Sequence, residues 1–193
     1  MMTKASLLFS EIIRRLVMFK IKDLFKTKNL ALMALLVAAN VVFSRFLSIN
    51  TFNIKIGFTF LTVMMAAYLF GPVGAMLVGG LGDVIGALLF PIAPFFPGFT
   101  LTAVITGLLY SFFINKKTSL VKIIIGVTVT ELFCSGLMNT FWIAYMYGSD
   151  FGALFVTRLT TQIIAMTVVE IVAAQLIFGK KMAIERIAKM TTK

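Results

Sequence analysis

The sequence predicts an all-α integral membrane protein, a six-helix bundle whose helices cross the bilayer. The first observation is composition. Of 193 residues, 60% are apolar and only 13% are charged, a balance that a soluble domain of this length could not cover with polar surface. The second is patterning, since apolar runs of 15 to 27 residues recur between Leu30 and Phe178, with short breaks carrying Gly, Pro, Asn or Lys. The third is that positive charge gathers on one side of these runs.

Turn residues divide the apolar stretch into six predicted spans, which cover about 29–47, 56–70, 72–90, 99–114, 121–147 and 153–178. Asn29 is suited to cap the first span, and a polar hairpin over 48–55 follows it. The second span is short and ends at Gly71, because Pro72 is favoured at the first position of a helix and so begins the third span.

Prolines, charges and a polar turn divide the rest of the chain. Pro91, Pro94 and Pro97 exclude a regular helix over the segment PIAPFFPGFT, so a loop rich in aromatic residues should join the third span to the fourth. Residues 115–117 (NKK) end the fourth span. Residues 148–150 (GSD) turn the chain between the fifth span and the sixth.

The distribution of Lys and Arg predicts that both termini are cytoplasmic, because inside loops carry an excess of positive charge. Three of the 18 positive charges, Arg45, Lys55 and Arg158, fall at the outer ends of spans. The other fifteen lie in inside tails and loops: Lys4, Arg14, Arg15, Lys20, Lys22, Lys26, Lys28, Lys116, Lys117, Lys122, Lys180, Lys181, Arg186, Lys189 and Lys193.

The chain then divides into three parts. Residues 1–28 form a basic, amphipathic cytoplasmic segment, residues 29–179 form the six-span membrane domain, and residues 180–193 form a basic cytoplasmic tail. Two interpretations of 1–28 stay open, a helix lying on the cytoplasmic leaflet and a partly ordered basic tail.

The residues that many enzymes need are absent. The chain has no His, and its single cysteine, Cys134, lies inside the fifth span, so metal sites, haem ligation through His, disulfide frameworks and His-based triads are not expected. No GxxxxGK[ST] loop is present to hold nucleotide phosphates, so any ATP-driven work must come from a partner. Nucleic-acid binding is not expected either, because apolar spans interrupt every basic stripe. We therefore expect no enzyme, catalytic residue or cofactor.

Cations and aromatic rings converge at the outer ends of the predicted helices. Arg45, Asn53 and Lys55 surround the first loop, residues 95–99 (FFPGF) supply rings, and Arg158 lies near the start of the sixth span. An anionic ligand with a flat ring would suit this combination, since cations neutralise carboxylates and rings stack on rings. The alternative, which composition leaves equally open, is that the cations extend to lipid headgroups and the rings form an interfacial belt.

Polar residues within the spans favour a pocket, because such groups are costly in hydrocarbon and usually face the bundle interior. Asp83 lies two turns below the outer end of the third span. Helical spacing places two polar stripes on the fifth and sixth spans, at Glu131, Ser135, Asn139 and Trp142 and at Arg158, Thr161 and Gln162. Asp83 could instead bond neighbouring backbone or pair with an arginine. For Glu131 and Glu170, which lie nearer the cytoplasm, we favour a role in helix packing or solvent contact.

Small residues indicate where helices touch. Two small-xxx-small pairs at 75/79 and 82/86 in the third span are expected to pack within the bundle. Ala34 and Ala38 make another pair in the first span. A packing seam within the bundle is the default interpretation of that pair, and a flat face for another subunit is the alternative.

Three ordered segments carry a resemblance to a known family. They are RFLSINTFNIKIGFTF at 45–60, YLFGPVGAMLVGGLGDVIGALLFP at 68–91 and FFPGFTLTAVITGLLY at 95–110. The chain resembles the folate-specific substrate-binding component, or S component, of energy-coupling factor (ECF) vitamin transporters. The similarity covers most of the hydrophobic chain and is less distinct in the last two spans, where the choice among related vitamins could change.

The resemblance implies a bundle that binds folate from outside and carries it across the plasma (inner) membrane. It also implies docking onto a transmembrane coupling (T) subunit that carries two cytoplasmic ATPases. Ala34 and Ala38 match the AxxxA pattern that contacts the coupling subunit in such components, although the Trp that follows in some members is Val42 here. Transport in this family is thought to involve the whole component tipping over in the membrane.

The residues considered for the site suit folate. Its glutamate carboxylates would pair with the cations, and its pterin ring would stack on Phe96 or Trp142. The donor edge of the pterin would bond Asp83 or Asn139. The complete set of expected ligand-binding residues is Arg45, Asn53, Lys55, Phe58, Asp83, Phe96, Phe99, Thr100, Asn139, Trp142, Arg158 and Gln162.

Three alternatives stay open. The same scaffold could carry another vitamin, or the chain could be a small channel or assembly protein. It could also be a stand-alone secondary transporter, which would usually be larger and have internal repeats or broken helices; no such repeat is evident in the sequence.

Overall fold

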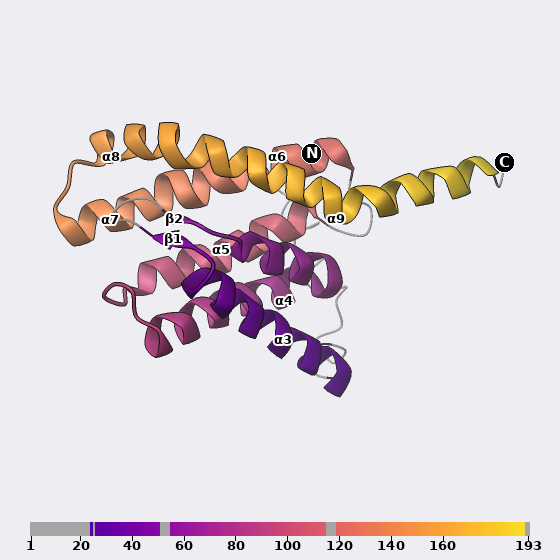
Figure 1. Cartoon of the computed structure of the whole chain (residues 1–193), viewed down its shortest axis with the longest axis horizontal. Helices are drawn as coiled ribbons and strands as arrows, with labels where there is room; N and C mark the ends of the chain where they lie inside the picture. The colour runs from indigo at the N-terminus through magenta and orange to yellow at the C-terminus, as the bar shows by residue number, and fades with distance from the viewer. Residues whose placement is uncertain (1–23, 25, 51–54, 115–118, 192–193) are drawn as a thin grey trace, which may run out of the picture.

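The computed structural model describes residue 24 and residues 26–50, 55–114 and 119–191. Over these ranges the chain is helical apart from one small hairpin, which confirms the predicted all-α class (Figure 1). The α-helices are α3 Thr27–Arg45, α4 Thr59–Leu89, α5 Pro97–Phe113, α6 Leu120–Thr130, α7 Asn139–Tyr147, α8 Phe151–Arg158 and α9 Ile164–Thr191. Two π-helical segments join α6 to α7 and α8 to α9, namely η1 Glu131–Met138 and η2 Leu159–Ile163.

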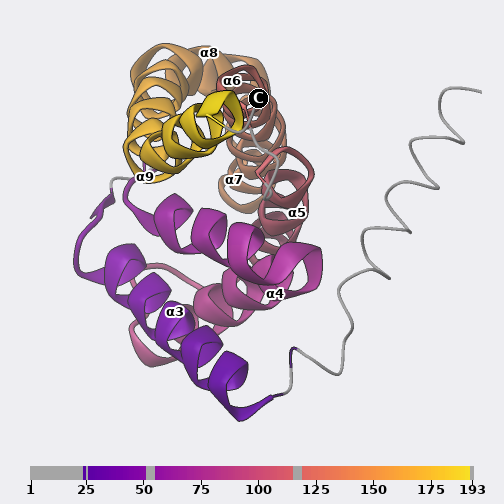
Figure 2. The same ribbon diagram turned by 90° about the vertical axis from the view of Figure 1, so that its right-hand side faces the viewer.

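The helices form two groups that α5 connects. Figure 2 shows α3 and α4 on one side of the bundle and α6, α7, α8 and α9 on the other, and α5 packs against α4, α6, α7 and η1. The continuous run α6–η1–α7 lies beside the continuous run α8–η2–α9 (Figure 1). These runs are antiparallel, since α6 contacts α9, η1 contacts η2 and α7 contacts α8.

The predicted break between the second and third spans is a kink inside α4. Gly71 has φ 72° and ψ −160°, a backbone conformation that a residue without a Cβ atom adopts readily. Pro72 follows at the start of the next helical stretch, where its missing N–H costs nothing. α4 is therefore made of two helical halves, 59–70 and 72–89.

Two helices begin two residues earlier than the sequence predicts. α3 starts at Thr27 with Lys26 at the N-cap position, so Asn29 lies inside the helix and its predicted capping role is wrong. α5 starts at Pro97 and not at Phe99. Pro97 was expected to prevent a helix, but the first helical turn tolerates proline, because the N–H groups of that turn have no intrahelical partner.

Two short polar connections lie where the sequence predicts them, after α3 and after α7. The first loop is a hairpin of β1 (Ile49–Asn50) and β2 (Lys55–Ile56), with Asn50 opposite Lys55. At the turn over 148–150, Gly148 ends α7 with φ 63°. Asp150 then caps α8 by accepting a hydrogen bond from the Ala153 N–H at 2.7 Å.

Small residues let α4 approach its neighbours. A Cβ atom on Gly79 would lie 2.7 Å from the Ala103 carbonyl oxygen, and one on Gly107 would lie 2.5 Å from the Ala75 carbonyl oxygen, so the backbones of α4 and α5 are in close contact. The predicted internal packing of these small residues is confirmed. Ala34 and Ala38, in contrast, are exposed on α3, so the default interpretation of that pair as a seam within the bundle is wrong.

The outer surface is apolar, as expected of a multi-pass membrane protein. Large apolar side chains are exposed along the helices, among them Leu35 at 62%, Leu88 at 64% and Leu176 at 69%. Among the described residues, four helical stretches are long and apolar enough to cross a bilayer, and α5 is a shorter apolar helix: the four are Thr27–Arg45, Thr59–Leu89, Leu120–Tyr147 and Phe151–Gly179.

The predicted terminal segments are only partly described. Most of the basic amphipathic segment at 1–28 lies outside the described residues. At the other end, α9 continues to Thr191, so the backbone of most of the predicted tail at 180–193 is helical.

Candidate ligand-binding cavity

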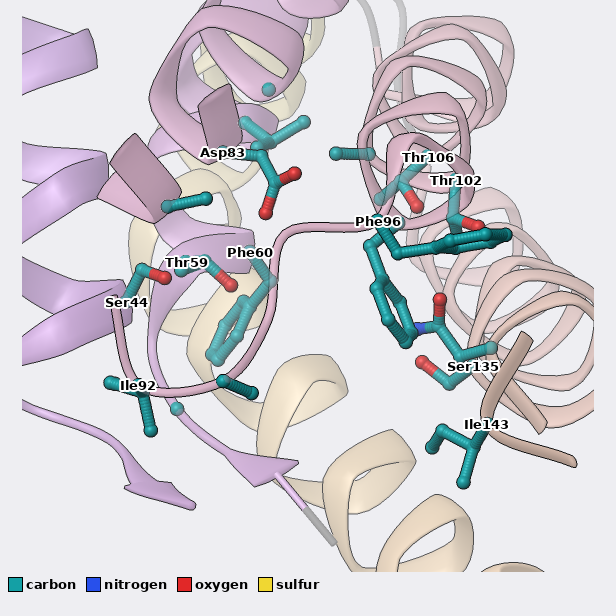
Figure 3. Close-up of a pocket in the computed structure, with 18 of the residues that line it drawn as sticks. Ser44, Thr59, Phe60, Asp83, Ile92, Phe96, Thr102, Thr106, Ser135 and Ile143 are labelled. Atoms are coloured by element: carbon teal, nitrogen blue, oxygen red, sulfur yellow. The ribbon is translucent and has the colours of Figure 1, made fainter. Parts of the chain in front are cut away.

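A cavity of about 330 Å³ lies between the two groups of helices, a volume within the range of small-molecule sites. Residues from α3, α4, α5, the proline loop 91–96 and both long helical runs line it. In Figure 3, Phe60 and Asp83 of α4 lie on one side of the cavity, and Phe96 and Ser135 lie on the other.

One end of the cavity combines an arginine, an aspartate and the proline loop. Arg45, the last residue of α3, lies against Gly86 of α4, and its Nε atom is buried without a hydrogen-bond partner among the described residues. Asp83 accepts a hydrogen bond on Oδ2 from the Thr100 hydroxyl at 2.7 Å. Thr100 does not line the cavity, and it acts on the site by orienting Asp83.

An aromatic cluster forms the adjoining wall. The ring of Phe96 lies 5.5 Å from that of Trp142, 6.1 Å from Phe99 and 6.1 Å from Tyr145, measured between centroids. Phe96 and Phe99 line the cavity, and Trp142 does not. Trp142 instead supports Phe96 from behind, held by a hydrogen bond of 3.1 Å from its Nε1–H to the Thr102 hydroxyl.

The π-helical segments set which side chains of the two long helical runs face the cavity. A π-helix has more residues per turn than an α-helix. Residues four apart therefore remain on the same face over a greater length of each helical run. The lining residues accordingly recur at every fourth position, in one run at Glu131, Ser135, Asn139 and Ile143 and in the other at Arg158, Gln162, Met166 and Glu170.

This geometry corrects two members of the predicted stripes. The ideal α-helical spacing placed Trp142 in the pocket, but Ile143 occupies that position. The same spacing placed Thr161 on the pocket-facing stripe with Gln162. Thr161 is instead exposed, and its hydroxyl donates a hydrogen bond to the Thr157 carbonyl of its own helix at 2.6 Å. In both cases the π-helical turn shifts the phase of the helix.

Three buried charged residues, the buried Tyr110 and the half-buried Ser135 form the far end of the cavity, which we call the floor: Tyr110, Glu131, Ser135, Arg158 and Glu170. The Tyr110 hydroxyl donates a hydrogen bond to Oε2 of Glu170, and Ser135 donates to Oε1 of Glu131 at 3.1 Å. Arg158 donates from Nη2 to the Ser135 carbonyl oxygen at 3.3 Å.

The exposures of the floor carboxyl groups correct a further expectation. Glu131 is 7% exposed and Glu170 is 2% exposed, and both line the cavity. The predicted role in solvent contact is therefore wrong. Hydrogen-bonding capacity is left over around the cavity, because Oε2 of Glu131 and Oδ1 of Asn139 are also buried without a partner among the described residues. Such atoms are rare unless a ligand or water satisfies them.

The structure brings seven of the twelve predicted ligand-binding residues to the cavity: Arg45, Asp83, Phe96, Phe99, Asn139, Arg158 and Gln162. Thr100 and Trp142 support lining residues. Phe58 is 44% exposed and outside the cavity, next to the lining residue Phe60. Asn53 lies outside the described residues, and only the backbone of Lys55 is described.

Several lining residues were missed by the sequence reasoning. Asn40 of α3 lines the cavity and donates from Nδ2 to the Thr62 hydroxyl at 2.7 Å. Thr106 and Tyr110 of α5 also line it. A polar residue such as Asn40 in the middle of an apolar span was the available signal, whereas nothing in the local sequence distinguishes the threonines of α5.

The apolar outer surface and the buried polar cavity together define a helical membrane protein that can hold a small polar molecule. The family model described as ECF transporter, substrate-specific component, matches residues 28–180. The chain therefore belongs to the family of ECF transporter substrate-specific components, which are transport subunits and not enzymes.

Individual relatives agree with this assignment. The chain is 37% identical over 166 residues to a protein named folate transporter FolT from Clostridium novyi, covering 86% of this chain and 94% of that one. A folate transporter FolT from Leuconostoc mesenteroides is 36% identical over 123 residues, covering 63% of this chain and 66% of that one. A crystal structure of FolT bound with folic acid superposes with a TM-score of 0.76 at 34% identity, covering 80% of this chain and 95% of that one.

Proposed function

We propose that this protein is the folate-binding S component of an ATP-driven ECF transporter in the plasma (inner) membrane. The observation that carries the proposal is the cavity itself, with aromatic rings and the buried Nε atom of Arg45 at one end and buried carboxyl groups at the other. Folate has a flat ring with hydrogen-bond donors at one end and carboxylates at the other, so it matches the cavity in shape and in charge.

The proposed contacts keep the expected set of ligand-binding residues. Arg45 neutralises a glutamate carboxylate of folate, and Lys55 and Asn53 of the first loop complete that end. Phe96 and Phe99 contact the central ring, and the remaining expected residues act from the walls or through their neighbours: Phe58, Asp83, Thr100, Asn139, Trp142, Arg158 and Gln162. The buried Nε of Arg45 supports the first contact, because a buried donor without a partner favours an anion.

We further propose six crossings with both termini in the cytoplasm. The kink at Gly71 separates the second and third crossings, and α5 is the fourth. The first half of α4 has 12 residues and is about 18 Å long, so it is a short crossing. The excess of Lys and Arg near the termini and in the segment 116–122 supports this orientation, with the first hairpin, the proline loop and the turn at 148–150 outside.

The proposed energy source is a partner complex. A transmembrane coupling subunit with two cytoplasmic ATPases would drive release of folate inside the cell. Ala34 and Ala38 are the proposed docking residues. Both are exposed on α3, and small residues four apart allow another helix to approach closely.

Calorimetry on the purified protein with folate, pantothenate, thiamine and riboflavin tests the proposed ligand. We expect saturable binding of folate at a ratio of one to one and no binding of the other three. Binding of a different vitamin would leave the family assignment unchanged and would replace folate as the proposed ligand. No binding of any of the four would favour the channel or assembly alternatives.

A further inference from the structure

The last residues of α4 and the proline loop that follows them are both exposed and apolar. Residues 88–95 (LLFPIAPF) form an unbroken run of exposed side chains, among them Leu89 at 66% and Ile92 at 51%. No charged residue occurs between Asp83 and Lys116. An exposed apolar patch with no charge of its own marks a contact with another protein or with a membrane.

The end of α3 enlarges this patch. Phe46 is 62% exposed and Leu47 is 53% exposed, and the ring of Phe46 meets that of Phe90 edge to face, with 5.2 Å between the centroids. We call residues 46–47 and 88–95 together the apolar rim. Figure 3 shows the chain passing along the cavity between Ile92 and Phe96, both of which line it, so the rim is the outer side of a cavity wall.

We propose that the apolar rim lies in the outer leaflet of the membrane, at the boundary between the lipid headgroups and the acyl chains. The rim continues the exposed apolar surface of the helices, since Leu88 and Leu89 are the last residues of α4. In contrast, the turn at 148–150, which lies at the same end of the molecule (Figure 1), has the polar sequence GSD. This inference goes beyond the proposed function and holds for any ligand of the cavity.

The contacts of Phe96 give the level of the loop relative to that polar turn. The ring of Phe96 lies 5.5 Å from that of Trp142 and 6.1 Å from that of Tyr145, measured between centroids. Both partners belong to α7, which continues to Tyr147. The loop therefore lies about one helical turn, roughly 5 Å, below the turn at 148–150. Figure 1 likewise shows the connection between α7 and α8 extending beyond the one between α4 and α5.

The two helices that carry the loop are short for a bilayer. Residues 72–89 of α4 make a helix about 27 Å long, and the 17 residues of α5 reach about 26 Å. The hydrocarbon core of a bilayer is about 30 Å thick. The run from Leu120 to Tyr147 has 28 residues and reaches about 40 Å. The long run can therefore carry its polar turn into water, whereas the short helices leave the rim at the edge of the hydrocarbon.

The backbone of the loop suits this level. Lipid cannot satisfy a backbone N–H group, and Pro91, Pro94 and Pro97 carry none. At the two ends of the loop, the Phe90 N–H donates to the Gly86 carbonyl at 3.0 Å and the Phe99 N–H donates to the Phe96 carbonyl at 3.1 Å. The prolines thus reduce the number of donors that the loop would expose to lipid.

Spin labels on single cysteines test the inference in the full-length protein reconstituted into lipid vesicles. In a Cys134→Ser background, Phe46→Cys and Phe90→Cys report on the rim, and neither position lines the cavity. Relaxation of each label is measured with oxygen, which concentrates in lipid, and with a water-soluble nickel chelate present on both sides of the membrane. Ile164→Cys, 57% exposed on α9, is the lipid reference, and Ser149→Cys is the water reference.

At both rim positions oxygen should relax the label more strongly than the nickel chelate, as at position 164, whereas the chelate should dominate at position 149. Dominance of the chelate at position 90 would place the loop in water and overturn the inference, whatever position 46 shows. Weak relaxation by both reagents would assign the rim to a protein contact and overturn it equally. Leu89→Cys replaces Phe90→Cys if that variant does not reconstitute. The measurement needs no ligand, so its result is independent of the proposed function.

Discussion

Arg45 and Gly86 are in direct contact across α3 and α4: a Cβ atom on Gly86 would come within 2.8 Å of Nε of Arg45. One turn away, a Cβ atom on Gly82 would lie 2.5 Å from Oδ1 of Asn40. Each glycine thus leaves room on α4 for a polar side chain of α3, and both of those side chains line the cavity. The glycines of this pair are therefore part of the site as well as of the helix packing.

Substitution of Gly86 by alanine should lower affinity without lowering stability. The added methyl group displaces the Arg45 guanidinium from its place at the cavity. Arg45→Ala, which removes that group completely, should weaken folate binding by about tenfold to a hundredfold, and Gly86→Ala should have a smaller effect in the same direction. Alanine is favoured over glycine in a helix by about 1 kcal/mol, so thermal unfolding in detergent should show no loss of stability.

Gly179→Ala is the control for that experiment, because a Cβ atom there meets nothing within 4 Å. It should leave calorimetric affinity unchanged. Unchanged affinity in Arg45→Ala would remove Arg45 from the site, and with it the reason for the effect of Gly86.

The positions of the helices were largely predictable because their signals are local. Apolar runs and proline positions mark the spans, and a glycine before a proline, as at Gly71, predicts a helix break. The ends were less accurate, as at Thr27 and Pro97, because several neighbouring residues can begin a helix equally well.

The site was less predictable, because the π-helical segments decide which side chains of the two long helical runs face the cavity. Nothing in the local residues predicts that η1 and η2 would shift both long helical runs, so the sequence placed Trp142 and Thr161 in the pocket wrongly. The sequence favours helix packing or solvent contact for Glu131 and Glu170, because both lie toward the predicted cytoplasmic ends of their spans. The depth of the cavity, a tertiary property, brings them to the floor.

Trp142 should report ligand binding through its fluorescence. It is the single tryptophan of the chain, and its ring lies 5.5 Å from that of the lining residue Phe96. A ligand that contacts Phe96 changes the surroundings of the indole, so titration with folate should change the emission saturably, with the midpoint found by calorimetry. Trp142→Phe should abolish this signal and, by removing the hydrogen bond to Thr102, weaken calorimetric affinity by about two- to tenfold.

A titration of free N-acetyltryptophanamide corrects that measurement for light absorbed by folate. A linear emission change that matches the free compound would contradict contact between the ligand and the aromatic cluster.

Bulky substitutions at Ala34 and Ala38 should separate binding from transport. Ala34→Trp and Ala38→Trp place an indole on the exposed face of α3, away from the cavity. Folate binding to the purified protein should therefore stay intact, whereas folate uptake by cells and co-purification with the coupling subunit should be lost. Ala165→Trp, at an exposed alanine of α9, is the matched control and should leave uptake unchanged. Normal uptake by both α3 variants would discard the docking face.

The proposed orientation predicts which loops a membrane-impermeant maleimide can reach. The lone Cys134 is 2% exposed and can be replaced by serine to give a background without cysteine. In intact cells, Ser149→Cys at the turn after α7 should be labelled at once, because this turn is proposed to be outside. Leu120→Cys, at the start of α6 and 43% exposed, should be labelled only after the membrane is permeabilised.

The opposite pattern would place the end of the cavity near Tyr147 in the cytosol and exclude uptake of ligand from outside. Because the two positions lie at opposite ends of the same continuous helical run, one pair of variants decides the direction of that crossing and, through the antiparallel packing of the two long runs, the side on which α9 ends.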